Sequence, residues 1–382
     1  MSKKIFLVAG EPSGDLHASR LAKEIKKTNQ NTALMGIGGP LMAREGVKLF
    51  YDSNELAIVG VSDVIKNFAT IKRIFTDFVK KVMEEKADLV ILVDYPGFNI
   101  RMAKALKSRG VKVLYYISPQ VWAWGKWRIN KIKKYVDKIL VLFDFEADLY
   151  KKSGVPAEFV GHPLLDIARS SSDKEVIMKR LSFDKNKKTV TLLPGSRKRE
   201  IDFLLPAMAK ACDLLYRRSN DIQFVIVRSS NLDSKIFDRY LQDFKAPHRV
   251  VENKENELYD CLSITDLAIA ASGTVTLECA IMNVPMVIIY KVSLLNAIIM
   301  KPFMSVSSIG LVNVLAGKKI VPELIQYSLT VGNLYREASE ILFNPAKSDD
   351  IKKRLRELKE TLGKPGASSR AARSVVEFMN AD

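Results

Sequence analysis

The stretch "DLVILVDYPGFNIRMAKAL", residues 88–106, decides the fold class. It begins with a continuous apolar run, which is typical of a strand buried on both faces of a parallel sheet. A turn with proline and glycine follows, and then apolar residues recur at helical spacing. Asp94 lies between this strand and this helix. Because open α/β sheets bind ligands outside the carboxyl ends of their strands, Asp94 is either a helix cap or a catalytic base.

The same strand–turn–helix pattern recurs along the chain. Further apolar runs are "KIFLVAG" (4–10), "VKVLYYISP" (111–119), "KTVTLLPGS" (188–196) and "DLAIAASG" (266–273). A polar stretch at 161–186 has the composition of a linker or hinge. We therefore expect an α/β fold with two Rossmann-like, doubly wound domains that face each other across a cleft. The expected parts are 1–165, 166–345, and C-terminal helices at 346–382.

Size, charge and cysteine usage limit the number of domains, the kind of partner and the state of the thiols. A chain of 382 residues is too long for one ordinary core. Its formal charge of +17 favours an anionic partner such as nucleic acid, lipid headgroups or a nucleotide. It has no apolar run of about 18 residues that could span a membrane, and its start does not resemble a signal peptide. Cys212, Cys261 and Cys279 lack metal-ligand spacing, so we expect buried, reduced thiols.

Two strand ends in the second half have the composition of phosphate-binding loops. "TLLPGSRKREI" (191–201) places Arg197 where a helix begins, and "AIAASGTVTLECA" (268–280) does the same with Ser272, Gly273 and Thr274. Small residues let backbone N–H groups approach an anion at the positive end of a helix. One turn further on, Glu278 could accept both hydroxyls of a ribose. Either loop alone is more often a structural cap, but two in one domain favour a nucleotide site.

In the first half, "LVAGEPSGDLHASRL" (7–21) carries Glu11, Ser13 and Asp15 at the end of the first strand. A tight turn with a helix cap and an acceptor-binding loop explain these residues equally well. The usual nucleotide fingerprints are missing. "GIGGPL" (36–41) lacks the GxGxxG spacing, and no stretch matches GxxxxGK[ST], which argues against dinucleotide redox chemistry and P-loop hydrolysis.

Two further segments combine apolar and basic residues. Residues 115–138 place three tryptophans among lysines and arginines, which could bind single-stranded nucleic acid, meet a lipid surface, or form a core edge beside a solvated helix. Residues 57–85 have apolar residues at helical spacing, among them Phe68, Phe75 and Phe78. A core-facing helix is the default interpretation, and a basic, apolar face lying on a bilayer is the alternative.

Taken together, the motifs resemble those of the lipid-A-disaccharide synthase family. They include "GEPSGD", "VDYPGFN", "YYISPQVWAW", "FVGHPL", "LLPGSR", "ASGTVTLE" and "VNVLAGKKIVPELIQ", in this order over nearly the whole chain. The resemblance implies the GT-B glycosyltransferase architecture and inverting transfer of 2,3-diacylglucosamine from its UDP derivative. The acceptor it implies is 2,3-diacylglucosamine 1-phosphate, attacked through its 6-hydroxyl, with no metal or redox cofactor.

The resemblance also implies roles for individual residues. It makes Asp94 the base, and it places Glu11, Ser13 and Asp15 at the acceptor side of the cleft. It assigns donor binding to Arg197, Ser272, Gly273, Thr274, Glu278, Asn313, Glu323 and Gln326. It suggests a cytoplasmic homodimer at the anionic inner face of the inner membrane, with no nucleic-acid partner. It also suggests that the C-terminal helices at 346–382 cross back or are exchanged in the dimer.

The chain departs from the family pattern at two places. The family often has a second aspartate where this chain has Gly97, and if that acid were the base the assignment of Asp94 would weaken. Gly310, Leu311 and Val312 replace the more usual Ser-Leu-Pro before Asn313. Two alternative functions are compatible with the sequence. One is a UDP-sugar epimerase of the same fold, and the other is a nonenzymatic RNA-binding protein that would use the positive charge.

Overall fold

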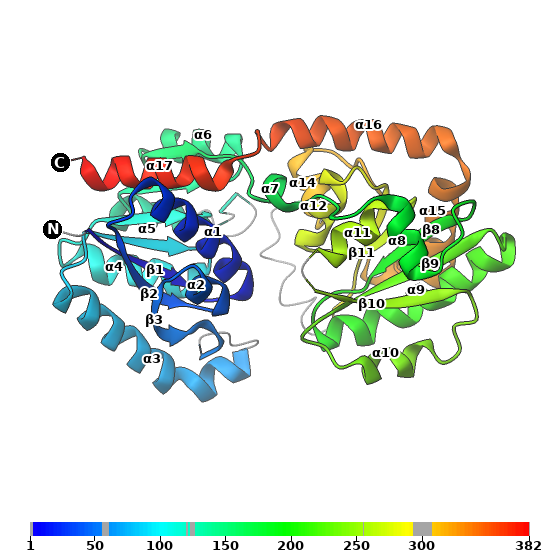
Figure 1. Ribbon diagram of the computed structural model, residues 1–382, viewed down its shortest axis with the longest axis horizontal. Helices are drawn as coiled ribbons and strands as arrows, with labels where there is room; N and C mark the ends of the chain where they lie inside the picture. The colour runs from blue at the N-terminus through cyan, green and yellow to red at the C-terminus, as the bar shows by residue number, and fades with distance from the viewer. Residues whose placement is uncertain are drawn as a thin grey trace. The chain divides into compact units, whose positions relative to one another are not determined.

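The chain folds into two compact units, each with its own parallel sheet. The computed structural model describes residues 3–55, 61–119, 121–122, 127–254, 256–292 and 308–381, with backbone alone for 54 and 61–68. The first unit comprises Met1–Leu165 and Leu362–Asp382, and the second comprises Asp166–Thr361. In both units helices alternate with the strands along the chain (Figure 1). The predicted α/β class with two doubly wound domains is confirmed.

Seven parallel strands form the sheet of the first unit, in the order β3-β2-β1-β4-β5-β6-β7. They are β1 (Lys4–Ala9), β2 (Ala33–Gly38), β3 (Lys48–Asp52), β4 (Leu89–Val93), β5 (Val113–Tyr116), β6 (Lys138–Val141) and β7 (Ala157–Phe159). The helices are α1 (Pro12–Thr28), α2 (Pro40–Arg44), α3 (Val61–Glu84), α4 (Pro96–Lys107), α5 (Arg128–Tyr135), α6 (Asp144–Lys152) and, from the chain's end, α17 (Ala367–Asn380), with a short 3₁₀ turn η1 (Ser53–Glu55). The strand order reverses between β1 and β4, and ligands of open sheets bind at such reversals.

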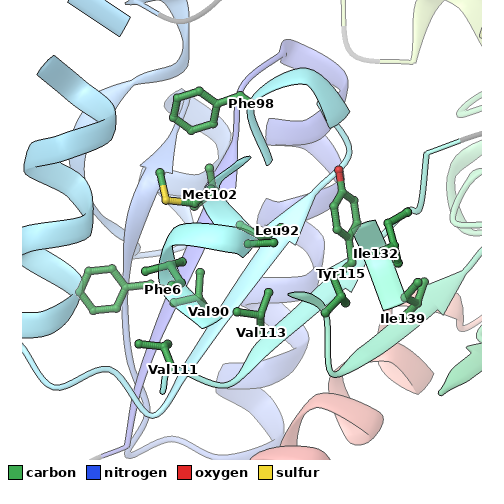
Figure 2. Packing of buried hydrophobic residues seen from close by; sticks show 14 of the residues in the cluster. Phe6, Val90, Leu92, Phe98, Met102, Val111, Val113, Tyr115, Ile132 and Ile139 are labelled. Carbon is green, nitrogen blue, oxygen red and sulfur yellow. The ribbon is translucent and has the colours of Figure 1, made fainter. Parts of the chain in front are cut away.

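The core of this unit lies between the sheet and its helices. Phe6, Leu92 and Val113 are fully buried there beside side chains of α4 and α5 (Figure 2). Phe78 of α3 belongs to the same core and is fully buried. Phe75 is half-buried and packs against it. The core-facing interpretation of 57–85 is therefore confirmed for this part of α3, whereas the side chain of Phe68 lies outside the described residues.

Six parallel strands form the sheet of the second unit, in the order β10-β9-β8-β11-β12-β13. They are β8 (Lys188–Leu193), β9 (Ile222–Ser229), β10 (His248–Asn253), β11 (Leu267–Ala271), β12 (Met286–Tyr290) and β13 (Glu323–Ile325). The helices are α8 (Lys174–Leu181), α9 (Lys198–Arg218), α10 (Ser234–Leu241), α11 (Glu257–Ser263), α12 (Thr274–Ile281), α14 (Leu311–Leu315), α15 (Val331–Phe343) and α16 (Pro345–Thr361), with the 3₁₀ turn η3 (Gln326–Ser328). The three cysteines are buried and unbridged, as the sequence predicts.

The stretch predicted as a linker contains two short helices, α7 (Leu164–Ile167) and α8. The boundary between the units lies inside α7. The C-terminal helices divide between the units, because α16 belongs to the second and α17 packs against α1 of the first (Figure 1). Arg370 of α17 fixes this return by donating from Nε to the carbonyl of Val160 at 2.9 Å. Among the described residues no helix is both long and apolar enough to cross a bilayer.

Candidate active site

Five of the residues predicted to bind the donor line one cavity in the second unit. They are Arg197, Ser272, Gly273, Thr274 and Glu278. The cavity has a volume of about 330 Å³ and lies at the carboxyl ends of β8 and β11. These two strands are neighbours, and the strand order of the sheet reverses between them. Both the position and the volume are typical of a nucleotide site in an open α/β sheet.

The two glycine-containing loops of this cavity differ in what they offer an anion. At the start of α9, the backbone N–H groups of Ser196 and Arg197 donate to the carboxylate of Glu200, at 2.9 and 3.3 Å. That loop therefore satisfies its own backbone donors, and what it can offer an anion is the Arg197 side chain, which is 66% exposed and pairs with Glu200 at 3.5 Å. No side chain of the described residues caps α12. Its first N–H groups are thus available to a phosphate, which the positive end of the helix also favours.

Glu278 lies one helical turn into α12 with its carboxyl group buried. The hydroxyl of Tyr259 donates to its Oε1 at 2.8 Å. Burial raises the pKa of Glu278, and the hydrogen bond from Tyr259 opposes that change. With one oxygen held by Tyr259, the other is left to accept from a ligand hydroxyl. Glu278 is predicted from the sequence, whereas Tyr259 and Glu200 are not. Glutamate at the third position of α9 was a recognisable capping signal.

Asn313 and Glu323, which the sequence analysis assigned to donor binding, bond instead to the protein around them. The Glu323 carboxylate accepts from the backbone N–H groups of Ile309 and Gly310, each at 3.1 Å. Asn313 donates to Glu323 at 2.7 Å, and its own oxygen accepts two further backbone N–H groups. Neither residue lines the cavity. Their network reaches it indirectly, because the Ser272 hydroxyl donates to the carbonyl of Ile309 at 3.2 Å.

Gln326 likewise bonds to a backbone N–H group of the protein, at the end of β13. Its side-chain oxygen accepts from the backbone N–H of Val292 at 3.1 Å, and it too is not among the residues lining the cavity. The departure from the family pattern at Gly310 has a steric explanation. A Cβ atom there would lie 2.4 Å from the Cδ1 of Ile288 and 2.9 Å from the Oε1 of Glu323. Glycine therefore lets the backbone approach the buried carboxylate.

Asp94 lies in the first unit, directly after β4, and Glu11 follows the neighbouring strand β1. The two acids thus share the reversal point of this sheet. The pKa of Asp94 is raised from 3.8 to about 6, mainly by burial and further by the negative charge of Glu11. The N-cap of α4 is Tyr95, and in the part of the chain that the structure describes no side chain caps that helix. Asp94 is therefore not the helix cap, and its pKa suits a general base at neutral pH.

The other two residues predicted at the acceptor side differ in exposure. Ser13 is exposed, like Glu11, whereas Asp15 is buried. The Asp15 carboxylate accepts from three backbone N–H groups at the start of α2, at 2.9 to 3.0 Å. Asp15 therefore has a structural role here, since it caps α2 and holds the "GIGGPL" loop. At Gly97 a Cβ atom would meet no atom of the described residues within 4 Å, so the backbone there leaves room for a side chain to begin.

The tryptophan-rich segment 115–138 contacts a buried acid in α6 that is not predicted from the sequence. Glu146 is buried at the start of α6, after β6, and accepts from the indole Nε1 of Trp122 at 2.9 Å. Burial raises its pKa to about 7, and the hydrogen bond from Trp122 opposes the change. Trp127 is 61% exposed, with the Lys131 ammonium 4.7 Å from its ring centroid. Trp124 lies outside the described residues.

The part of the chain that the structure describes contains no cluster of three or more histidine, cysteine or acidic side chains able to hold a metal ion. What it does contain is a nucleotide-type cavity in one parallel unit and a pair of acids at the equivalent point of the other. Over its whole length the chain is similar to a solved UDP-GlcNAc 2-epimerase from Neisseria meningitidis, at 12% identity and a TM-score of 0.65, covering 98% of this chain and 100% of that one. At this identity the likeness concerns the fold alone. The fold is of the GT-B type, with two Rossmann-like units.

The family itself is defined by sequence. A family model described as lipid-A-disaccharide synthetase matches residues 5–377. The chain is 40% identical to the lipid-A-disaccharide synthase of Geobacter metallireducens, over 99% of this chain and 98% of that protein. It is also 40% identical to the enzyme of the same name from Coxiella burnetii (strain Dugway 5J108-111), with 98% of each covered. The chain therefore belongs to the lipid-A-disaccharide synthetase family and is a disaccharide-forming glycosyltransferase.

Proposed function

We propose that the chain transfers a 2,3-diacylglucosamine unit from its UDP derivative to the 6-hydroxyl of 2,3-diacylglucosamine 1-phosphate. The bond between the donor's anomeric carbon and UDP breaks, a β-1′,6 bond to the acceptor oxygen forms with inversion, and the hydroxyl proton passes to a base. Family membership supports the reaction. The observation that carries the assignment of the donor is the cavity formed by Arg197, the loop 272–274 and Glu278.

Each lining group has a distinct task in this proposal. The open N–H groups of α12 bind one phosphate of UDP, and the helix end favours its negative charge. The Arg197 guanidinium grips the diphosphate through two donors, a geometry that lysine cannot supply. Glu278 accepts from the ribose hydroxyls with the oxygen that Tyr259 leaves open. Metal chemistry is not needed for the charge on the leaving diphosphate, because these groups stabilise it electrostatically.

Asp94 is the proposed base. The attacking hydroxyl must lose its proton as the new bond forms, and a carboxylate with a pKa near 6 can accept it at neutral pH. Glu11 keeps that pKa raised and, with Ser13, is exposed to an incoming acceptor.

Replacing Arg197 tests the donor site. Arg197→Ala should weaken UDP binding by about 1.5–3 kcal/mol, the usual worth of a charge-assisted hydrogen-bonded contact. Lys198→Ala is the matched control, because its ammonium pairs with Asp202 at 2.7 Å and it does not line the cavity. Calorimetric titration of UDP into both variants and the parent chain measures the difference. Equal affinities for Arg197→Ala and the parent chain would remove this arginine from the site.

The proposal extends to where the enzyme works. Its substrates carry acyl chains, so we propose that the enzyme associates peripherally with the anionic inner face of the inner membrane. We also propose that it is a homodimer, as the family resemblance suggests. The net charge of +17 and the cationic helix α5, which has no acidic residue, support an anionic surface. Sedimentation with anionic vesicles tests the association, and a chain that stays in the supernatant at low ionic strength would contradict it. Analytical ultracentrifugation tests the dimer.

A further inference from the structure

Asp94 and the residue after it have an unusual backbone conformation. Both Asp94 and Tyr95 have a φ of 49°, in the left-handed region. For residues other than glycine this conformation costs roughly 1–2 kcal/mol each. Positive φ occurs at other strand ends of the chain, at Gly195 after β8 and also at the non-glycine residues Ile117 and Gln326, but only here do two consecutive non-glycine residues among those described adopt it. Strain of this kind persists only where the surroundings impose it, and it is typical of functional sites.

Two buried side chains impose the conformation by bonding to the same carbonyl. The hydroxyl of Tyr115, on β5, donates to the backbone oxygen of Asp94 at 2.6 Å. The Nδ2 of Asn99, on α4, donates to that oxygen at 2.8 Å and to the carbonyl of Val93 at 3.1 Å. Tyr115 and Asn99 both have no exposed surface. Figure 2 shows the Tyr115 ring beside Ile132, and full burial leaves this ring little freedom to move.

The neighbouring strand completes the restraint. The Tyr95 ring lies against the backbone of Gly10, where a Cβ atom would be only 2.3 Å from Cδ1 of the ring. The residue after Gly10 is Glu11, whose charge acts on Asp94. The segment that carries Asp94 is thus restrained by Tyr115 of β5, by Asn99 of α4 and by the packing of Tyr95 against the loop that follows β1.

We propose that Tyr115 and Asn99 are positioning residues for the transfer reaction, which hold the Asp94 carboxylate in its reactive orientation by clamping its backbone carbonyl. Neither touches a reacting atom. This inference rests on the proposed role of Asp94 as the base. A misplacement of about 1 Å can cost on the order of 10²-fold in rate, so loss of one clamp should slow turnover well before it unfolds the protein.

A double-mutant cycle tests the inference. Tyr115→Phe removes one oxygen, and we expect it to lower kcat about tenfold or more with the KM for the UDP-sugar unchanged. Since Tyr115 acts only through Asp94, adding Tyr115→Phe to Asp94→Asn should slow the enzyme no further. Tyr51→Phe is the control for losing a tyrosine hydrogen bond in the same unit, because its hydroxyl donates to Asp77 at 2.5 Å. Asn99→Ala is tested in the same cycle. The inference can then be judged even if Tyr115→Phe does not fold.

The outcomes separate this inference from the proposed function. Full kcat in the Tyr115→Phe enzyme would overturn the positioning role. So would a Tyr115→Phe substitution that lowers kcat by the same factor in the Asp94→Asn background as in the parent chain. Near-normal turnover of Asp94→Asn alone would instead overturn the assignment of the base. A fall in kcat matched by Tyr51→Phe would mean that the effect is loss of stability and would also count against positioning.

Discussion

Asp94→Asn should lower kcat by about 10²–10⁴-fold, the usual contribution of a general base. The amide keeps the shape of the side chain but cannot accept the proton of the acceptor hydroxyl. UDP affinity should not change, because the donor cavity is built by other residues. Asp144→Asn is the matched control, an exposed acid that follows β6 of the same sheet. Near-normal turnover of Asp94→Asn would contradict the assignment.

The pKa of Asp94 adds a pH dependence with a definite sign. The base is active when ionised, so kcat/KM of the parent chain should fall about tenfold per pH unit below pH 6. The contribution of Asp94 to the stability of the fold has the opposite pH dependence, because it is present at low pH. A carboxyl with a raised folded-state pKa stabilises the fold below its unfolded pKa near 4, and this contribution is lost as the pH rises through 6. The melting temperature of Asp94→Asn at pH 8 should therefore equal or exceed that of the parent chain.

Glu323→Ala should lower the free energy of unfolding by about 3–5 kcal/mol, because it leaves buried donors without a partner. Three groups donate to this carboxylate: two backbone N–H groups and the amide of Asn313. UDP affinity should also fall, since the network extends to Ser272 in the donor cavity. Urea unfolding followed by circular dichroism measures the first effect. Glu340→Ala is the control, because its side chain is 54% exposed and pairs with Lys347 at the surface. A loss below about 1 kcal/mol for Glu323→Ala would contradict the structural role.

The sequence predicts the elements of this fold better than their order. Continuous apolar runs followed by turns and helical spacing identify the strands that became β1, β4, β5, β8 and β11. Periodicity reports local burial, however, and not which strands are neighbours. It could not show that β1 lies beside β4, or β8 beside β11, and those pairings are what bring Glu11 to Asp94 and Arg197 to the loop 272–274.

The candidate site shows a second limit. The family resemblance implied substrate-side roles for Asp15, Asn313 and Glu323, and for Asp15 a helix cap explained the sequence equally well. In the structure their side chains bond to backbone N–H groups. A buried polar residue must be hydrogen-bonded, but its sequence context is the same whether the partner is a substrate or the protein. Tyr115 could not be identified from the sequence as a hydrogen-bond donor to Asp94, because it lies in an apolar run that predicts only a buried strand.

One assay tests the central claim most directly. The full chain is incubated with UDP-2,3-diacylglucosamine and 2,3-diacylglucosamine 1-phosphate, and the products are identified by mass spectrometry and by NMR of the new linkage. We expect UDP and a β-1′,6-linked disaccharide 1-phosphate in equal amounts, and neither when one substrate is omitted. Conversion of the UDP-sugar to an epimer without any acceptor, with no disaccharide formed, would contradict the proposed reaction.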